Sequence, residues 1–165
     1  MKNILTIIAI FGGVAVSHGQ SFTANLDPFQ EVPSHNTPGY GSADFTLSGT
    51  TLSVDVSTGM YADLLAGATT VRLQDAAVGA NGPTVGLLTL DTPGNTSGTF
   101  SGSVTGLTGQ QVTDLMNGNL YVNIADSVFP SGEIRGQLEV VPEPSTLALV
   151  GAGVLGLLAR CRRQI

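Results

Sequence analysis

The residues between Gln20 and Val141 offer few side chains for catalysis. This stretch holds one histidine, His35, with no cysteine and no lysine. Ser34 precedes His35, but the side chains of adjacent residues seldom point toward each other, so we do not expect a nucleophile paired with a base. The Gly-x-Ser-x-Gly pattern of hydrolase nucleophiles is also missing. We therefore expect no enzymatic activity and no catalytic residue, and we interpret His35 as a solvated loop residue.

Cofactor and metal sites have equally little support in the sequence. The glycine-rich stretches near Gly79 and at residues 94–109 contain no lysine for a phosphate group and precede strand-like segments, so we interpret them as turns. Asp75, Asp91 and Asp126 could contribute to a calcium site, but their spacing matches no EF-hand loop. We expect no cofactor and name no metal ligand. A carboxylate pair for glycoside hydrolysis stays open, because the distance between the two groups in space decides that chemistry.

The charge of the chain limits its partners. All acidic residues lie between Asp27 and Glu143, where Arg72 and Arg135 are the only basic residues. Such an acidic segment argues against binding to nucleic acid or to an anionic lipid surface. Solubility is the simplest explanation of the acidity. Binding of a divalent cation or of a basic partner stays an alternative.

The N-terminus has the pattern of a secretory signal peptide at residues 1–19. A positively charged start at Lys2 is followed by an apolar run at residues 4–16 and by the small residues Ser17 and Gly19. We predict that signal peptidase cleaves between Gly19 and Gln20. An uncleaved membrane anchor is the alternative, but the apolar run is shorter than the roughly 20 residues that span a bilayer.

The C-terminal residues 142–165 form a tail of three parts: a Pro-Glu-Pro motif, an apolar stretch at 146–159, and an arginine cluster. The motif and cluster residues are Pro142, Glu143, Pro144, Arg160, Arg162 and Arg163. The prolines favour an extended linker, and the stretch at 146–159 is predicted to form a transmembrane helix.

This tail closely resembles the PEP-CTERM sorting signal of Gram-negative bacteria. The resemblance implies that the membrane enzyme exosortase recognises the tail, removes it, and passes the protein to the cell surface or the extracellular matrix. The tail also contains the only cysteine, Cys161, which would be lost with it. Without an exosortase the tail would be a simple inner-membrane anchor.

The segment at residues 20–141 is predicted to be an all-β domain, an antiparallel β-sandwich or a barrel-like fold. Short runs of alternating apolar residues are separated by Gly, Asn, Ser, Thr and Pro, as in Phe22, Ala24 and Leu26. We predict one hairpin that pairs residues 45–47 with 52–56, and another that pairs 121–126 with 133–140. One sheet face should be core and the other solvated.

Three further local features can be predicted. Thr108 with Gln111 forms a capping-box pattern, which predicts one short helix at residues 110–117 that ends at Gly118. Gly136 in mid-strand indicates a bulge or the close approach of another backbone. Arg135 is expected to pair with a carboxylate on the sheet surface, and Glu133 is nearest in sequence on the same face.

The domain also resembles the CHRD domain, which occurs in chordin and in many secreted bacterial proteins. The matching segments lie at residues 22–26, 30–33, 107–108, 114–115, 118–124 and 129–138. Many CHRD domains carry a His-x-His pair where this chain has Arg72 and Gln74, so metal or proton chemistry of such a pair is not available here. Arg72 and Gln74 should lie together on one strand face, beside Asp75 and the loop at residues 79–83.

Both resemblances together imply a function. We expect a non-enzymatic exported surface or matrix protein whose CHRD-like domain serves interaction or adhesion, with exosortase and signal peptidase as partners during export. A carbohydrate- or cation-binding module of the extracellular polymer layer is the alternative.

Overall fold

The computed structural model describes residues 19–142, whose strands are all paired antiparallel. The strands are β1 (Gln20–Leu26), β2 (Tyr40–Ser48), β3 (Thr51–Val54), β4 (Met60–Ala62), β5 (Ala68–Asp75), β6 (Thr84–Leu90), β7 (Gly98–Val104), β8 (Leu120–Asp126), β9 (Ile134–Gln137) and β10 (Glu139–Val140). A 3-10 helix, η1 (Pro28–Gln30), and an α-helix, α1 (Gly109–Met116), complete the described part. The predicted all-β class with one short α-helix is confirmed.

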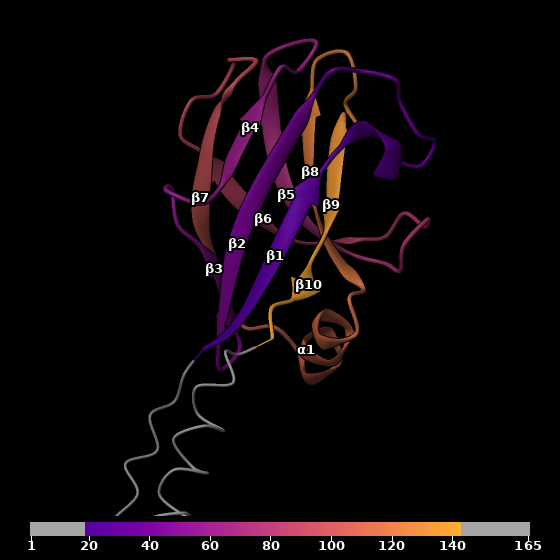
Figure 1. Cartoon of the computed structure of the whole chain (residues 1–165). Coiled ribbons are helices and arrows are strands. Elements are labelled where there is room, and N and C mark those ends of the chain that lie inside the picture. The colour runs from indigo at the N-terminus through magenta and orange to yellow at the C-terminus, as the bar shows by residue number, and fades with distance from the viewer. Residues whose placement is uncertain (1–18, 143–165) are drawn as a thin grey trace, which may run out of the picture.

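The strands form one sheet that wraps around the core and nearly closes on itself. Its order is β10-β1-β2-β3-β7-β6-β5-β8-β9, with β4 paired to β2 and β7. Strands β9 and β10 are separated only by Leu138, and they pair with β8 and β1, respectively. The backbones of Asp27 and Arg135 exchange two hydrogen bonds of 3.0 and 3.1 Å across the remaining gap. Figure 1 shows the result, with β1 and β2 in front of β5, β6 and β8.

Alternation along the strands builds the core. In β1, β2 and β3 every second side chain is buried, and the residues between them are mostly Ser, Thr, Asn or Asp that face outward. The largest apolar side chains of the core are Phe22, Phe45, Phe100, Leu52, Leu73, Leu115, Leu120, Ile124 and Ile134. Because all of them come from residues 22–134, the domain contains its own hydrophobic core.

Both predicted hairpins are present. Phe45 pairs with Val54 in the β2–β3 hairpin, and Ile124 pairs with Ile134 in the β8–β9 hairpin. Gly136 on β9 shows the predicted close approach, since a Cβ atom there would lie 2.7 Å from the carbonyl oxygen of Asn25. The β1 and β9 backbones can therefore meet only where no side chain intervenes.

Helix α1 begins one residue before its predicted start and has the predicted cap. The Thr108 hydroxyl accepts the backbone N–H of Gln111 at 3.2 Å, and the Gln111 side chain accepts the backbone N–H of Thr108 at 2.9 Å. Leu115 is fully buried and packs into the end of the core. Gly118 has a φ of +72°, the left-handed conformation that commonly ends a helix.

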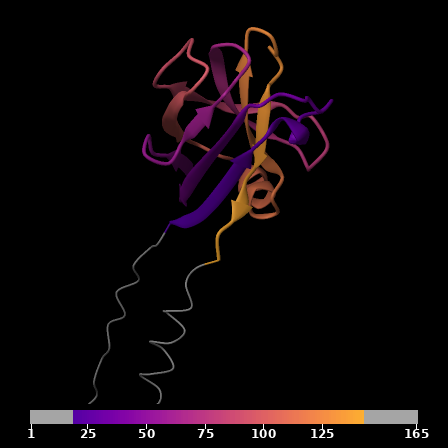
Figure 2. The same cartoon turned by 45° about the horizontal axis from the view of Figure 1, so that its top comes forward.

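The first and last described residues lie side by side. The Val141 N–H donates to the Ser21 carbonyl oxygen at 2.9 Å, and the Gln20 side chain donates to the Val141 carbonyl oxygen at 3.2 Å. Figures 1 and 2 show both chain ends leaving the domain at the same end, close to α1. Within residues 19–142, no helix has the length and apolar character needed to cross a membrane.

Candidate functional site

The outer face of β5, β8 and β9 is covered, which corrects the prediction of a solvated face. Glu133 and Arg135 were expected at the sheet surface, yet their exposed fractions are 0 and 1%, and that of Gln137 on the same face is 8%. Two loops lie over this face, one at residues 27–38 and the other at residues 76–83. The alternating pattern correctly predicted that these side chains share one face. The two loops bury that face, although its side chains are polar.

Six polar side chains form two rows across this covered face. The strand registers place Asn123 of β8 between Arg72 of β5 and Arg135 of β9, and they place Tyr121 of β8 between Gln74 and Gln137. Arg72 and Gln74 therefore lie together on one face, and Gln74 contacts Gly82 of the loop at residues 79–83, as predicted.

Arg135 does not pair with Glu133 at the surface as predicted. Its guanidinium donates hydrogen bonds to the carbonyl oxygens of Ala80 at 2.7 Å and Ala77 at 3.2 Å, and to the Gln137 side-chain oxygen at 3.1 Å. The Cζ atom lies 3.4 Å from the centroid of the Tyr121 ring, a cation–π contact. Burial lowers the pKa of Arg135 below its ordinary value. The buried arginine thus holds the loop at residues 76–83 against the sheet.

The other polar side chains secure the same loop. Gln137 donates to the Ala76 carbonyl oxygen at 2.9 Å, and Gln74 donates to the Gly82 carbonyl oxygen at 2.9 Å. The Gly82 N–H donates to the Tyr121 hydroxyl at 3.1 Å. The Asn81 side chain links the two covering loops by donating to the Val32 carbonyl oxygen at 2.7 Å.

A depression of about 250 Å³ lies between the two loops and the β8–β9 turn, and we call it the loop pocket. It is lined by Glu31, Val32, Arg72, Gln74, Asn81, Tyr121, Asn123 and Ser131. The Asn123 side chain donates to Glu31 Oε1 at 2.9 Å. Burial raises the pKa of Glu31 to about 7, although the positive charge of Arg135 acts in the opposite direction. Gly132 is required beside this pair, because a Cβ atom there would lie 2.3 to 2.6 Å from the Asn123 amide and Glu31 Oε1.

A pair of buried carboxyl groups, Asp126 and Glu133, lies at the end of the β8–β9 hairpin. Both Glu133 oxygens accept the Leu65 N–H, at 3.1 and 3.0 Å. Asp126 accepts the N–H groups of Ala66 at 2.9 Å, of Val128 at 2.9 Å, and of Phe129. Burial and a hydrogen bond to Asp126 raise the pKa of Glu133 to about 7. The two carboxyl groups therefore tie the β8–β9 turn to residues 65 and 66.

The opposite side of the domain is an open sheet face with many hydroxyl groups, which we call the hydroxyl face. One row across β1, β2, β3 and β7 consists of Ser21, Thr46, Ser53 and Ser103, each partnered with the next. These side chains are exposed or half-buried, and Figure 1 shows no loop or helix in front of β1 and β2.

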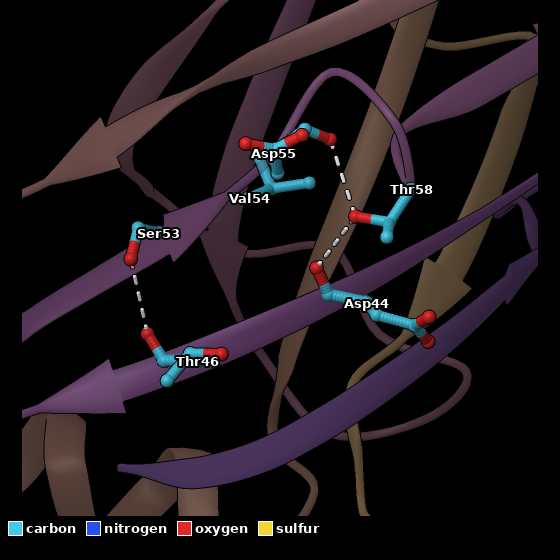
Figure 3. Close-up of a pocket in the computed structure, with 6 residues that line it drawn as sticks. All are labelled: Asp44, Thr46, Ser53, Val54, Asp55 and Thr58. Carbon is cyan, nitrogen blue, oxygen red and sulfur yellow. Dashed lines mark hydrogen bonds between the residues drawn. The ribbon is translucent and has the colours of Figure 1, made fainter.

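A shallow hollow of about 270 Å³ marks one part of the hydroxyl face. Figure 3 shows Asp44 and Thr46 from β2, Ser53 from β3, and Asp55 and Thr58 from the turn beyond it. The Thr58 hydroxyl lies between the carbonyl oxygens of Asp44 and Asp55, at 3.2 and 3.1 Å. Backbone and side-chain hydrogen bonds from Ser57 lower the pKa of Asp55.

The residues predicted for processing lie at one end of the domain or outside the described part. Gly19 and Gln20 stand at the start of β1, and Pro142 follows β10. The remaining sorting residues and the predicted helix at 146–159 lie outside the described residues. The cleavage after Gly19 stays a prediction, as do the boundaries of the three segments.

The histidine and carboxylates considered for chemistry are dispersed. His35 is half-buried, with its ring centroid 4.2 Å from that of Phe129, so it is not the simply solvated residue that was predicted. Among residues 19–142, no group of three or more His, Cys, Asp or Glu side chains could hold a metal ion. Asp126 accepts backbone N–H groups, and Asp75 and Asp91 lie on different segments.

Comparison with known proteins gives two matches. The family model of the CHRD domain matches residues 22–138, and that of the PEP-CTERM protein-sorting motif matches residues 140–163. The CHRD match begins in β1 and ends directly after β9, so it covers the sheet apart from β10 and the first two residues of β1. No curated protein and no solved structure matches the chain.

Proposed function

The chain belongs to the CHRD domain family, and from this membership we propose that its domain is a non-enzymatic interaction module of the cell surface or extracellular matrix. The PEP-CTERM motif makes it an exported protein that exosortase recognises during sorting, with a surface or extracellular location. The sorting motif concerns only export and location, so the interaction role is our own proposal.

The hydroxyl face carries this proposal. Its central row presents the hydroxyl groups of Ser21, Thr46, Ser53 and Ser103 at the spacing of neighbouring strands, about 5 Å apart. Hydroxyl groups both donate and accept hydrogen bonds, so such a row can contact a hydrated polymer or a polar protein surface. Its charged neighbours, Asp44 and Asp55, are acidic, which disfavours a polyanionic partner.

The position of the chain ends supports the same role. Gln20 and Val141 lie together at one end of the domain, whereas the hydroxyl face runs along its side (Figure 2). Attachment through the C-terminal tail would leave this face free to contact other molecules.

Binding to native extracellular polymer tests the proposal. The purified full chain should co-sediment with polymer isolated from the host, and Thr46→Lys should weaken this association because it places a long cation in the middle of the hydroxyl row. Thr96→Lys adds the same side chain at an exposed loop position away from the face and should bind like the wild type. Equal binding of both variants would reject the hydroxyl face as the contact surface.

The non-enzymatic part has its own test. Prolonged incubation with the protein should leave the chain length of the polymer unchanged, as measured by size-exclusion chromatography. A shift to shorter chains that depends on protein concentration would show hydrolysis and contradict the proposal.

A further inference from the structure

The PEP-CTERM sorting motif begins inside the sheet. Its match starts at Val140, and Val140 is the last residue of β10. Among the described strands, β10 pairs only with β1 and ends the strand order of the sheet. Figure 1 shows it beside β1, at the end of the domain from which both chain ends leave. Strand β1 therefore holds a segment that belongs to the sorting motif.

Both backbone hydrogen-bonding groups of Val141, the residue before the Pro-Glu-Pro sequence, are occupied. The Val141 N–H donates to the Ser21 carbonyl oxygen at 2.9 Å. The Val141 carbonyl oxygen accepts a hydrogen bond from the Gln20 side chain at 3.2 Å. An extended peptide is recognised largely through its main-chain hydrogen bonds. An enzyme that binds the chain at Val141 must therefore displace it from β1.

Strand β10 can separate from β1 without unfolding the core. Leu138 is fully buried, and its N–H donates to the Leu120 carbonyl oxygen at 2.9 Å, so the chain is anchored just before β10. The side chains at residues 139–141 are already exposed, so separation costs mainly hydrogen bonds. Local openings of this kind need less free energy than global unfolding, and proteolysis follows the population of the open form.

We propose that the pairing of β10 with β1 is a gate that sets the rate of tail removal. Exosortase acts on the chain after residues 139–142 have separated from β1, and Gln20 and Ser21 hold the closed form. This proposal rests on the removal of the tail that the PEP-CTERM motif implies. It does not depend on the interaction role proposed above, because it involves the carbonyl group of Ser21 and not its hydroxyl group.

A reversible crosslink tests the gate. Ser21 lies opposite Val141, next to the paired residues Phe22 and Val140, and cysteines at opposed positions of neighbouring strands can form a disulfide. The double variant Ser21→Cys, Val141→Cys should therefore lock β10 to β1 in the oxidising periplasm. Pulse-chase labelling of host cells that express the full chain should show tail removal slowed at least about tenfold. Dithiothreitol should restore the wild-type rate.

A second crosslink controls for general stabilisation of the domain. Thr89 of β6 and Ser101 of β7 are also paired directly, and neither residue contacts β10. The double variant Thr89→Cys, Ser101→Cys should form a disulfide and still lose its tail at the wild-type rate. Equal slowing by the two crosslinks would overturn the proposal, as would removal of the tail from the locked Ser21–Val141 variant at the wild-type rate.

Opening the gate tests the proposal without a crosslink. Gln20→Ala removes the side-chain donor to the Val141 carbonyl oxygen and should speed tail removal by about two- to tenfold, as expected for the loss of one hydrogen bond. Gln110→Ala makes the same change at an exposed position of α1 and should leave the rate unchanged. The proposal is overturned if Gln20→Ala does not accelerate removal, or if the wild type keeps its tail in the host.

Discussion

Replacing Glu133 with glutamine should make the stability of the domain less dependent on pH. Burial first, and then the hydrogen bond to Asp126, raise the pKa of Glu133 from its ordinary value of 4.5 to about 7. Above pH 4.5 the unfolded chain releases a proton that the folded protein still holds. The stability that comes with protonated Glu133 is therefore complete below pH 4.5 and is lost as the pH rises to 7.

The size of the effect follows from the change in proton affinity. Each pKa unit, a tenfold change in proton affinity, corresponds to about 1.4 kcal/mol. Ionising Glu133 therefore costs on the order of 3 kcal/mol more in the folded protein than in the unfolded chain. Glutamine stays neutral throughout, can accept the Leu65 N–H, and can donate to Asp126. The free energy of unfolding of Glu133→Gln, measured relative to wild type, should thus rise by about 3 kcal/mol between pH 4 and pH 8.

Urea denaturation at a series of pH values measures this difference. Circular dichroism is the suitable signal, because the chain contains no tryptophan. Glu139→Gln is the control, since it removes the same charge from an exposed position and leaves the buried pair intact. The pKa of Glu31 is also raised to about 7, so Glu31 likewise lowers the stability of the domain as the pH rises. This loss is the same in the wild type and in Glu133→Gln, and it cancels when the two free energies of unfolding are compared. If the free energy of unfolding of Glu133→Gln relative to wild type stays constant or falls as the pH rises, the reasoning is refuted.

Two other substitutions test the covered face and the helix cap. Arg135→Met should destabilise the domain by about 3 kcal/mol, because the carbonyl oxygens of Ala77 and Ala80 lose their hydrogen bonds to the charged guanidinium. Hydrogen exchange should then accelerate in the loop that carries them, and unchanged exchange would contradict the role given to Arg135. Thr108→Ala should lower the free energy of unfolding by about 1 kcal/mol through the loss of the hydrogen bond to Gln111. A denaturation midpoint equal to that of the wild type would show that the cap contributes nothing.

The parts of the fold that could be predicted from sequence depend on local patterns. The alternation in β1, the two hairpins and the Thr108 cap are each encoded within a few neighbouring residues, and all were predicted correctly. The assumption of a solvated face failed at Glu133 and Arg135, because alternation shows which residues share a face but not whether distant loops cover it.

The loop pocket was missed for the same physical reason. Glu31 and Asn123 are separated by 92 positions, and their contact depends on how the loop after β1 folds back over β8. No local pattern in the sequence shows that this loop folds back over β8. One signal was present in the sequence: Gly136 in mid-strand indicated that another backbone passes close to β9, and this backbone is the end of β1, from which the covering loop departs.

The closure of the sheet at β9 and β10 also determines how the domain can bear mechanical force. If the tail is attached and a partner is held elsewhere on the domain, tension enters at Val141 and runs along β10 into β9. These segments are hydrogen-bonded to β1 and to β8, and Leu138 between them is fully buried. Tension along a strand loads its hydrogen bonds together rather than one after another. The segments that close the fold are thus also the first to carry such a load, because they immediately precede the sorting signal.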